Sequence, residues 1–260
     1  MAFDELVLHS GSSTACVVPS RGGLVSRFRV GDRDVLFLDP ATLADETKNV
    51  RGGVPILFPF AGKPPAGSPL KQHGFARTSA WTVLQAEKAQ VSCALEASDA
   101  TRACFPHDFR LELTVSLDGA ALTLAFKVQN HGKTPMPLHF GLHPYFAVPL
   151  EAKRTARVET HATTAFDQRK GTSGPRPPID FGGDEVDLHL LDHAVPRTVL
   201  HHSSDVSLNW SPNFTTLVLW TLPGQPFICV EPWSGPAGTL GKHTLAPGST
   251  EAFEFQIRST

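Results

Sequence analysis

The segment FRLELTVSLDGAALTLAFKVQN, residues 109–130, most constrains what this chain can fold into, because apolar and polar residues alternate along it. Successive side chains of a β-strand point to opposite faces of a sheet, so this alternation gives the segment one apolar face. The Asp118-Gly119 pair interrupts the alternation, and this dipeptide is a strong signal for a tight turn between two strands. The segment therefore predicts a β-hairpin with one buried face.

The rest of the chain predicts many more strands and very little helix. Its 22 prolines and 21 glycines are spread throughout, which suits strands and loops better than long helices. We expect no more than a turn or two of helix, near residues 40–48. Further strand candidates lie at residues 6–10, 14–19, 24–30, 33–38, 80–87, 91–97, 206–211, 215–221, 227–233 and 251–259. So many short strands predict an all-β fold, a large antiparallel sandwich or barrel.

Length and charge narrow the class of protein. The chain has 260 residues, a mass of 28.1 kDa and a formal net charge of −2. It can therefore bury a large core, and its charge does not favour nucleic acid or an anionic membrane as a partner. Residues 167–185 are rich in proline, glycine and charge and are expected to form a long loop. Because strand signals resume in the same style after it, we expect residues 1–260 to form a single domain.

No segment indicates export or a membrane span. The longest apolar runs are well short of the ~20 residues that a spanning helix needs, and the start, MAFDELVLHS, lacks the pattern of a signal peptide. The four cysteines, Cys16, Cys93, Cys104 and Cys229, contain no C-x-x-C pair, so they indicate neither a zinc site nor a redox site. We expect reduced, buried thiols in a cytoplasmic protein.

Two glycine-containing segments carry basic side chains. In RGGVPILFPFAGK, glycine and proline can hold Arg51 and Lys63 in fixed places near an oxygen-rich ligand, although a turn with solvated charges fits the composition as well. In KQHGFAR, an extended backbone would place His73, Phe75 and Arg77 on one face. That face would suit a polar ligand. Alternatively, His73 only hydrogen-bonds a nearby backbone carbonyl.

The segment HFGLHPYF contains two histidines four residues apart, His139 and His143. If the segment is extended, the two share one face until Pro144 ends the strand, because proline cannot donate to a sheet. A histidine at a strand end is well placed for proton transfer. The alternatives are a pair of core histidines, or a metal site that combines both with His73 and a carboxylate.

The segment FICVEPWSGP places one carboxylate, Glu231, directly after an apolar run and before Pro232 and Trp233. Such a carboxylate should be partly removed from water, which raises its pKa and makes it a better base near neutral pH. The alternative is a strand-end glutamate that points into solvent.

Taken together, these segments resemble the aldose 1-epimerase, or galactose mutarotase-like, superfamily. The resemblance implies a β-supersandwich fold and the interconversion of the α and β anomers of a sugar, with no cofactor and no metal. It is specific because it comprises six segments in the order of the family: RGGVPILFPFAG, HGFARTSAW, FPHDFRLELTVSL, VQNHGKTPMPLHFGLHPYF, EVDLHLLDHAV and FICVEPWSGP.

The resemblance also implies roles for individual residues. His143 in HPYF looks like the general acid, and Glu231 in EPW looks like the general base. His73 in HGF resembles a second histidine that contacts the substrate, and Arg51 in RGG resembles an arginine that binds it. Asp187 in VDLHLLD is similar to the aspartate that holds sugar hydroxyls. His139 is then expected to be structural.

The motifs differ on whether the sugar is phosphorylated. RGGVPILFPFAG followed by HGFAR resembles the hexose-6-phosphate 1-epimerase branch, in which basic residues bind the phosphate, and Arg51, Lys63 and Arg77 would do so here. GLHPYF is closer to the branch that acts on free sugars. The expected partner is therefore a small sugar or sugar phosphate, and the chain is expected to be a monomer or a weak dimer.

Two other functions compete with this prediction. A non-catalytic carbohydrate-binding sandwich would keep the aromatic residues and Arg51 but would not need His143 and Glu231 together. A metal-dependent β-barrel enzyme would use His73, His139 and His143 as ligands.

Overall fold

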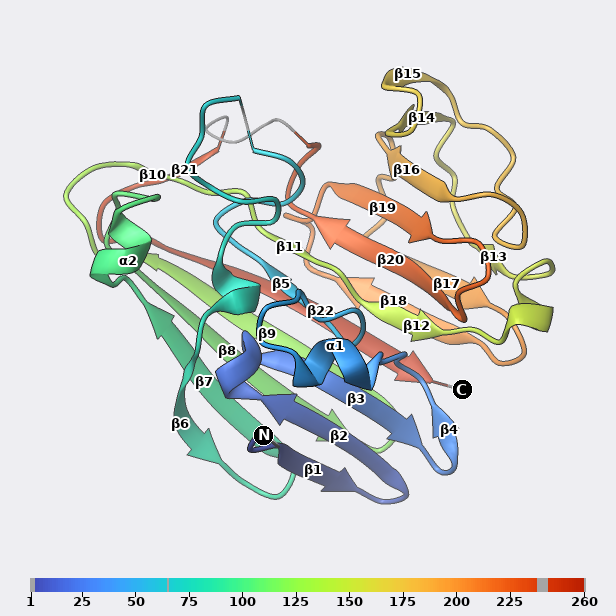
Figure 1. Ribbon diagram of the computed structural model, residues 1–260, viewed down its shortest axis with the longest axis horizontal. Coiled ribbons are helices and arrows are strands. Elements are labelled where there is room, and N and C mark those ends of the chain that lie inside the picture. The colour runs from blue at the N-terminus through green and yellow to red at the C-terminus, as the bar shows by residue number, and fades with distance from the viewer. Residues whose placement is uncertain (1–2, 65, 238–242, 260) are drawn as a thin grey trace.

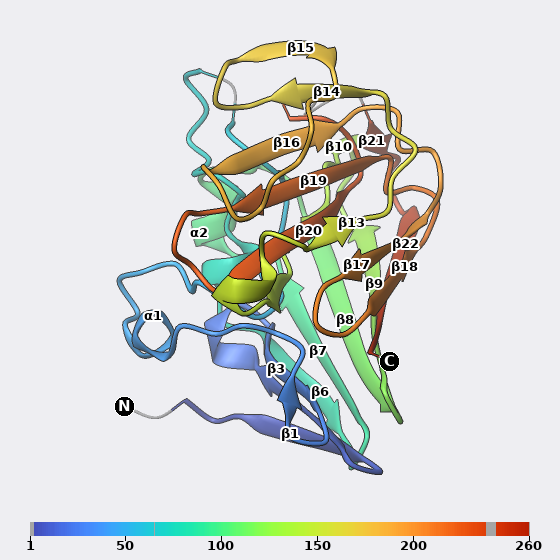
Figure 2. The same ribbon diagram turned by 90° about the vertical axis from the view of Figure 1, so that its right-hand side faces the viewer.

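The computed structural model describes residues 3–64, 66–237 and 243–259. Figure 1 shows the chain as layers of antiparallel strands with only short helices, and Figure 2 shows the same layers from the side. Within the described residues, no helix is both long enough and apolar enough to cross a bilayer. The all-β architecture expected from the alternation and the frequent turn residues is confirmed.

The predicted hairpin lies near the centre of an eight-stranded antiparallel sheet. Its strands β8 (Phe109–Asp118) and β9 (Ala121–Asn130) pair along their whole length, and Gly119 adopts a φ of 52° in the turn between them. The strand order is β13-β17-β18-β22-β9-β8-β7-β6. The other strands are β6 (Thr82–Ala86), β7 (Gln90–Glu96), β13 (Arg157–Val158), β17 (Arg197–His201), β18 (Val206–Trp210) and β22 (Thr250–Ser259).

A second eight-stranded antiparallel sheet carries most of the later sequence. Its order is β15-β14-β16-β19-β20-β11-β5, and β12 also pairs with β20. Its strands are β5 (Ile56–Leu57), β11 (Gly141–Leu142), β12 (Tyr145–Ala147), β14 (Thr164–Asp167), β15 (Thr172–Pro175), β16 (Val186–Leu190), β19 (Thr216–Thr221) and β20 (Phe227–Trp233). The short strands β11 and β12 place the HFGLHPYF segment directly beside β20.

One hydrophobic core joins these two sheets. The Phe140 ring lies 4.9 Å from that of Phe126 on β9 and 4.7 Å from that of Phe253 on β22. Ile228 and Val230 of β20 belong to the same core, whereas the alternate residues of β20 do not. Burying each large apolar side chain contributes roughly 1.5–3 kcal/mol. The opposite face of β20 is therefore left available for a site.

The smaller elements complete the fold. A four-stranded sheet has the order β1-β2-β3-β4, and β10 pairs with β21. Asp39 caps the helix α1, which confirms the helical turn expected near residues 40–48. The bounds are β1 (Leu6–Ser10), β2 (Ser13–Val18), β3 (Leu24–Val30), β4 (Arg33–Asp34), β10 (Met136–Pro137), β21 (Thr244–Leu245), α1 (Pro40–Ala44), α2 (Asp99–Arg102), and the 3-10 turns η1 (Pro19–Arg21), η2 (Ala76–Thr78) and η3 (Leu150–Ala152).

Two predicted segments differ from the structure. The strand expected at residues 33–38 is confined to β4, and beyond it Leu36 and Leu38 form only single bridges. The long loop expected at residues 167–185 begins instead with a hairpin, because Gly171 at φ 67° allows β15 to fold back on β14. Strand β15 is largely exposed at the edge of its sheet, so it shows none of the apolar alternation by which a strand is predicted.

Candidate active site

A cavity of about 570 Å³ opens on the face of β20 that points away from the core. Val218 of β19 and Trp233 of β20 contribute to its apolar lining. Seven of the residues that the sequence singled out come from five separate segments and line this cavity: Arg51, Lys63, His73, Arg77, His143, Asp187 and Glu231. The fold therefore brings together side chains that lie up to 180 positions apart in the chain.

Glu231 and His143 form a buried pair at the base of the cavity. Glu231 is 1% exposed and lies within β20. His143 comes from the turn between β11 and β12. The distance from His143 Nδ1 to Glu231 Oε1 is 3.5 Å, and Trp233 Nε1 donates a hydrogen bond of 3.2 Å to Glu231 Oε2. This geometry lets both groups act on one bound molecule.

Burial controls the protonation of this pair. It raises the pKa of Glu231 well above its usual value, and the negative charge of Asp187 acts in the same direction. Burial also lowers the pKa of His143 to about 3, with a further contribution from the positive charge of Arg77. Desolvation disfavours the charged form of each group. Both shifts favour the neutral forms, a carboxylic acid beside a neutral imidazole.

His73 occupies an unusual backbone position. Its φ is 65°, in the left-handed region that non-glycine residues seldom adopt. Two hydrogen bonds to Gly62 hold it there: the backbone N–H of His73 donates to the Gly62 carbonyl at 2.9 Å, and the Gly62 N–H donates to His73 Nδ1 at 3.0 Å. Burial lowers the pKa of His73 well below its usual value. Since Nδ1 accepts, the proton of the neutral ring lies on Nε2, which also lies 3.2 Å from the side-chain amide of Gln72.

The extended strand expected around His73 is wrong. Gly74 adopts φ 67°, and the chain then enters the 3-10 turn η2. Phe75 consequently packs against Phe58 and Phe109, with ring centroids 6.0 and 5.8 Å away, and it belongs to the core. The tight turn nevertheless returns Arg77 to the cavity. His73 and Arg77 therefore share one site, as predicted, but a turn and not an extended strand brings them together.

The Arg77 guanidinium retains unused donor capacity. Its Nη2 donates to the Gln72 carbonyl at 2.9 Å. Its Nε is buried and has no hydrogen-bond partner among the described residues. An unpaired buried donor is costly unless a ligand or water satisfies it, so this arginine favours an oxygen-rich ligand.

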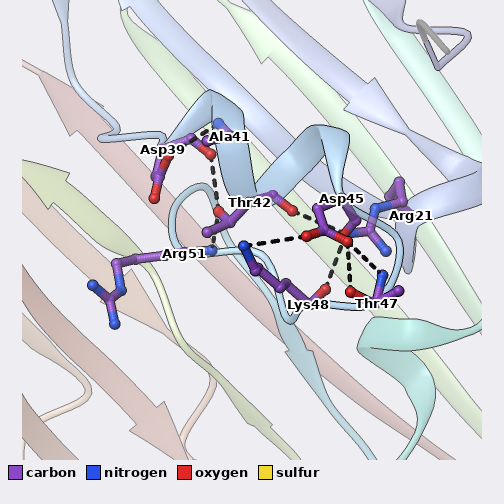
Figure 3. A network of polar contacts seen from close by, with 8 residues as sticks. All are labelled: Arg21, Asp39, Ala41, Thr42, Asp45, Thr47, Lys48 and Arg51. Atoms are coloured by element: carbon purple, nitrogen blue, oxygen red, sulfur yellow. Dashed lines mark hydrogen bonds and ion pairs between the residues drawn. The ribbon is translucent and has the colours of Figure 1, made fainter.

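The backbone of Arg51 is held by the loop that contains α1 (Figure 3). Its N–H donates to Thr42 Oγ1 at 2.9 Å, and its carbonyl accepts from the Asp39 N–H at 2.8 Å. The buried guanidinium of Arg21 secures this loop through hydrogen bonds of 3.1 to 3.2 Å to its carbonyl groups, which belong to Thr42, Leu43, Asp45 and Lys48. The Arg51 guanidinium points away from this network in Figure 3, and it lines the cavity.

The cavity also contains residues that the motifs did not indicate, among them Arg169 and His189. Arg169 projects from the β14–β15 turn, where its Nη1 donates to the Glu185 carbonyl. His189 lies on β16 with its Nε2 3.6 Å from Asp187 Oδ1, and its buried Nδ1 has no partner among the described residues. The spacing of His189 from Asp187 could have revealed it, because residues i and i+2 of a strand share one face.

The alternative metal site of His73, His139 and His143 is not assembled. His139 Nδ1 accepts from the Ala61 N–H at 3.3 Å, and its Nε2 bonds the Gly235 carbonyl at 2.8 Å. Both ring nitrogens are therefore engaged, and His139 is not among the residues that line the cavity. These bonds tie β11 to neighbouring segments, which fits the structural role expected of His139.

Comparison with known proteins gives one consistent result. The family model described as aldose 1-epimerase matches residues 4–258. A Salmonella typhimurium protein with the provisional name glucose-6-phosphate 1-epimerase is 33% identical over 227 residues, which cover 80% of this chain and 75% of that protein.

Solved structures agree with this result. The Slr1438 protein of Synechocystis sp. PCC 6803 is 30% identical, with a TM-score of 0.94 over 100% of this chain and 96% of that one. A galactose mutarotase-like protein of Lactobacillus casei has a TM-score of 0.80 at 22% identity, over 99% and 100% of the two chains. The second likeness concerns the fold alone.

Proposed function

The chain belongs to the aldose 1-epimerase family of sugar isomerases, and from this premise we propose that it interconverts the α and β anomers of a hexose 6-phosphate without a cofactor. One observation carries the proposal: the buried His143–Glu231 pair, 3.5 Å apart, lies at the base of a cavity that is also lined by four basic side chains. The pair supplies the proton transfers, and the cations suit a charged substituent on the sugar.

The proposed reaction opens and recloses the sugar ring. Glu231 takes the proton of the anomeric hydroxyl while His143 gives a proton to the ring oxygen, and the C1–O5 bond breaks. The C1–C2 bond then rotates, and the reverse transfers close the ring on the other face of C1. Positioned acids and bases typically contribute about 10²–10⁴-fold each.

Burial affects the proton transfers through the protonation state of the His143–Glu231 pair. Before ring opening, the pair must be ionised, with the proton on His143. After ring opening, Glu231 holds the proton and His143 is neutral. Burial favours this neutral state through the pKa values of both groups. The cavity therefore stabilises the pair in the open-chain stage relative to the ionised starting stage, and forming the ionised pair in the substrate complex has a free-energy cost.

The remaining polar side chains are proposed to position the sugar. His73 would donate from Nε2, because its Nδ1 already accepts from Gly62. Asp187 would accept from sugar hydroxyls, and His189 offers the unpaired Nδ1 beside it. Trp233 fixes Glu231 through the indole N–H, so this tryptophan sets the direction of the carboxylate.

Four cations support a phosphorylated substrate over a free sugar. Arg51, Lys63, Arg77 and Arg169 all line the cavity, whereas a neutral aldose needs no cluster of positive charge. Arginine presents a planar set of donors that matches phosphate oxygens, and the unpaired Nε of Arg77 is such a donor. The name of the Salmonella typhimurium relative supports the same substrate class.

Anomer exchange measured by NMR tests the reaction. Wild-type protein should accelerate exchange of glucose 6-phosphate or galactose 6-phosphate. Glu231→Gln and His143→Asn should each fold and lose most of that rate, roughly 10²-fold or more. His139→Asn is the matched control, because His139 lies outside the cavity, and it should lose less. Near-wild-type exchange by Glu231→Gln or His143→Asn would remove that residue from the mechanism.

Comparison of phosphorylated and free sugars tests the substrate class. Arg77→Ala should raise KM for the hexose 6-phosphate at least about tenfold, since a charged hydrogen bond contributes roughly 1.5–3 kcal/mol. The same change should leave any activity on free glucose nearly unaltered. Faster turnover of free glucose or galactose than of their 6-phosphates by the wild type would refute the phosphate assignment and leave the epimerase assignment intact.

A further inference from the structure

A cysteine that the proposed reaction does not use lies beside the proton-transfer pair. Cys229 precedes Glu231 by two residues on β20, so both side chains are on the face that points away from the core. The Cys229 sulfur, a Glu231 carboxylate oxygen and a His143 ring nitrogen all lie within 4.8 Å of one another. The three residues are at most 9% exposed. Three different ligand types therefore converge on one buried point.

The spacing of two of these atoms matches that of metal ligands. Zinc binds nitrogen, oxygen and sulfur at about 2.0–2.3 Å in a tetrahedral arrangement, so its ligand atoms lie roughly 3.3–3.8 Å from one another. The distance from His143 Nδ1 to Glu231 Oε1 is 3.5 Å. His143 Nδ1 is buried and has no hydrogen-bond partner among the described residues. It is available as a ligand without breaking an existing bond.

The charge of the ligand set also suits a divalent cation. A thiolate, a carboxylate and a neutral imidazole together carry two negative charges, so a divalent ion makes a neutral cluster, which avoids the cost of a buried net charge. A soft thiolate selects zinc or cadmium over magnesium or calcium. His143 and Glu231 line the cavity, which provides a route for the ion.

We propose that His143, Cys229 and Glu231 form an inhibitory site for zinc or another thiophilic divalent cation. Binding forms three coordinate bonds, to Nδ1, Sγ and a carboxylate oxygen, and releases the thiol proton and the carboxylic acid proton to solvent. The ion then occupies the lone pairs that proton transfer needs. The inhibitory effect rests on the proposed function, whereas the binding site itself does not.

Equilibrium dialysis of zinc against the purified chain tests the site without reference to activity. Wild-type protein should bind one zinc ion tightly, and Cys229→Ala should weaken that binding at least about tenfold. Cys104→Ala is the matched control, because this half-buried thiol lies outside the cavity, and it should bind zinc as the wild type does. Cys229→Ser supplies a second, nearly isosteric variant in case Cys229→Ala folds poorly.

Anomer exchange with added zinc tests the inhibition. Zinc should abolish the exchange catalysed by the wild type and by Cys104→Ala, EDTA should restore it, and magnesium should have no effect. The Cys229 variants should keep their basal exchange, and their inhibition should need a zinc concentration at least about tenfold higher. Equal zinc binding by the Cys229 variants and the wild type would overturn the site. Tight zinc binding at Cys229 with unimpaired exchange would overturn the inhibitory role, and a chain with no exchange activity would still give a clear result by dialysis.

Discussion

Burial has opposite effects on the two groups of the central pair. His143 has a pKa lowered to about 3, and Glu231 has a pKa raised well above its usual value, although the two side chains lie only 3.5 Å apart. Direct attraction between opposite charges would shift both pKa values in the other direction. Desolvation therefore outweighs pairing at this site, as expected for side chains at most 9% exposed.

The pKa of His143 predicts a loss of stability in acid. Its folded-state value is about 3 and its ordinary value is 6.5, so between these pH values the unfolded chain binds a proton that the folded chain does not. The contribution of His143 to the free energy of unfolding should fall by about 1.4 kcal/mol for each pH unit below 6.5, down to about pH 3, whereas the raised pKa of Glu231 acts in the opposite direction above its ordinary value. Urea denaturation across this range should show a shallower loss for His143→Asn than for the wild type.

His201 provides a control of opposite sign. Its bond to Glu159 raises its pKa, so its contribution to stability is present below the ordinary pKa and is lost as the pH rises through the folded value. His201→Asn should therefore be less stable than the wild type in acid and approach it above that range. A pH profile for His143→Asn parallel to that of the wild type would mean that His143 is not kept neutral by burial.

At the scale of elements, the cavity depends on short irregular segments between strands. The loop that contains α1 supports Arg51, and the turn around Gly74 supports His73. Neither segment carries a periodic pattern of apolar residues. Their shape comes from hydrogen bonds to groups distant in sequence, such as those of Arg21 to the carbonyls of Thr42 and Lys48.

Thr42 is predicted to position Arg51. Thr42→Val removes the acceptor of the Arg51 N–H with little change in shape. It should raise KM for the hexose 6-phosphate roughly threefold to tenfold, the value of one ordinary hydrogen bond, and leave kcat nearly unchanged. Thr42→Ser should restore the wild-type KM. Thr47→Val, in the same loop but with its hydroxyl bonded to Asp45, is the control, and an equal rise in its KM would mean that the loop acts only through its stability.

Gly74 is predicted to be intolerant of any side chain. A Cβ atom there would lie 2.2 Å from the Phe58 carbonyl oxygen, at a φ of 67°. Gly74→Ala should lower the free energy of unfolding by more than about 3 kcal/mol, because steric overlap adds to backbone strain of order 1–3 kcal/mol. Gly67 has a comparable φ of 81°, and a Cβ atom there would have nothing within 4 Å. Gly67→Ala should therefore lower the free energy of unfolding only by the backbone strain. Similar values for the two variants in urea denaturation would contradict the overlap.

At the scale of the whole molecule, the inner and outer faces of the two large sheets have different roles. Their inner faces share the core that contains Phe126, Phe140 and Phe253, and the outer face of β20 carries Glu231 and Trp233. Figures 1 and 2 show that β14, β15 and β16 extend one of these sheets beyond the other. This extension contributes Arg169, Asp187 and His189 to the cavity.

Because segments from most of the chain meet at the cavity, ligand binding should stabilise the entire fold. A ligand at 100 times its Kd adds about 2.7 kcal/mol to the free energy of unfolding. Glucose 6-phosphate should therefore raise Tm by several degrees in a thermal shift assay, and glucose at the same concentration should raise it less. An equal rise for Arg77→Ala and the wild type with glucose 6-phosphate would show that Arg77 does not contact the phosphate.

The sequence alone determined the strand content and the family. Alternation along residues 109–130 and the Asp118-Gly119 turn are local properties of the chain, so they predict β8 and β9 without knowledge of the fold. The six ordered motifs, from RGG at Arg51 to EPW at Glu231, also belong to the sequence. They contain six of the seven predicted residues that meet at one cavity, because each motif consists of the residue types that the chemistry needs.

Only the tertiary structure decided how these residues are oriented and what else lies among them. The left-handed backbone of His73 depends on Gly62 and on the close approach of Phe58 to Gly74, contacts that no local pattern records. The exposed strand β15 lacks a buried face to mark it. Likewise, Cys229 comes within ligand distance of His143 only because β12 and β20 pair across more than 80 positions of chain. Packing of the sheets brings distant segments together, and these segments bury the site. This burial, in turn, shifts the pKa values of His143 and Glu231.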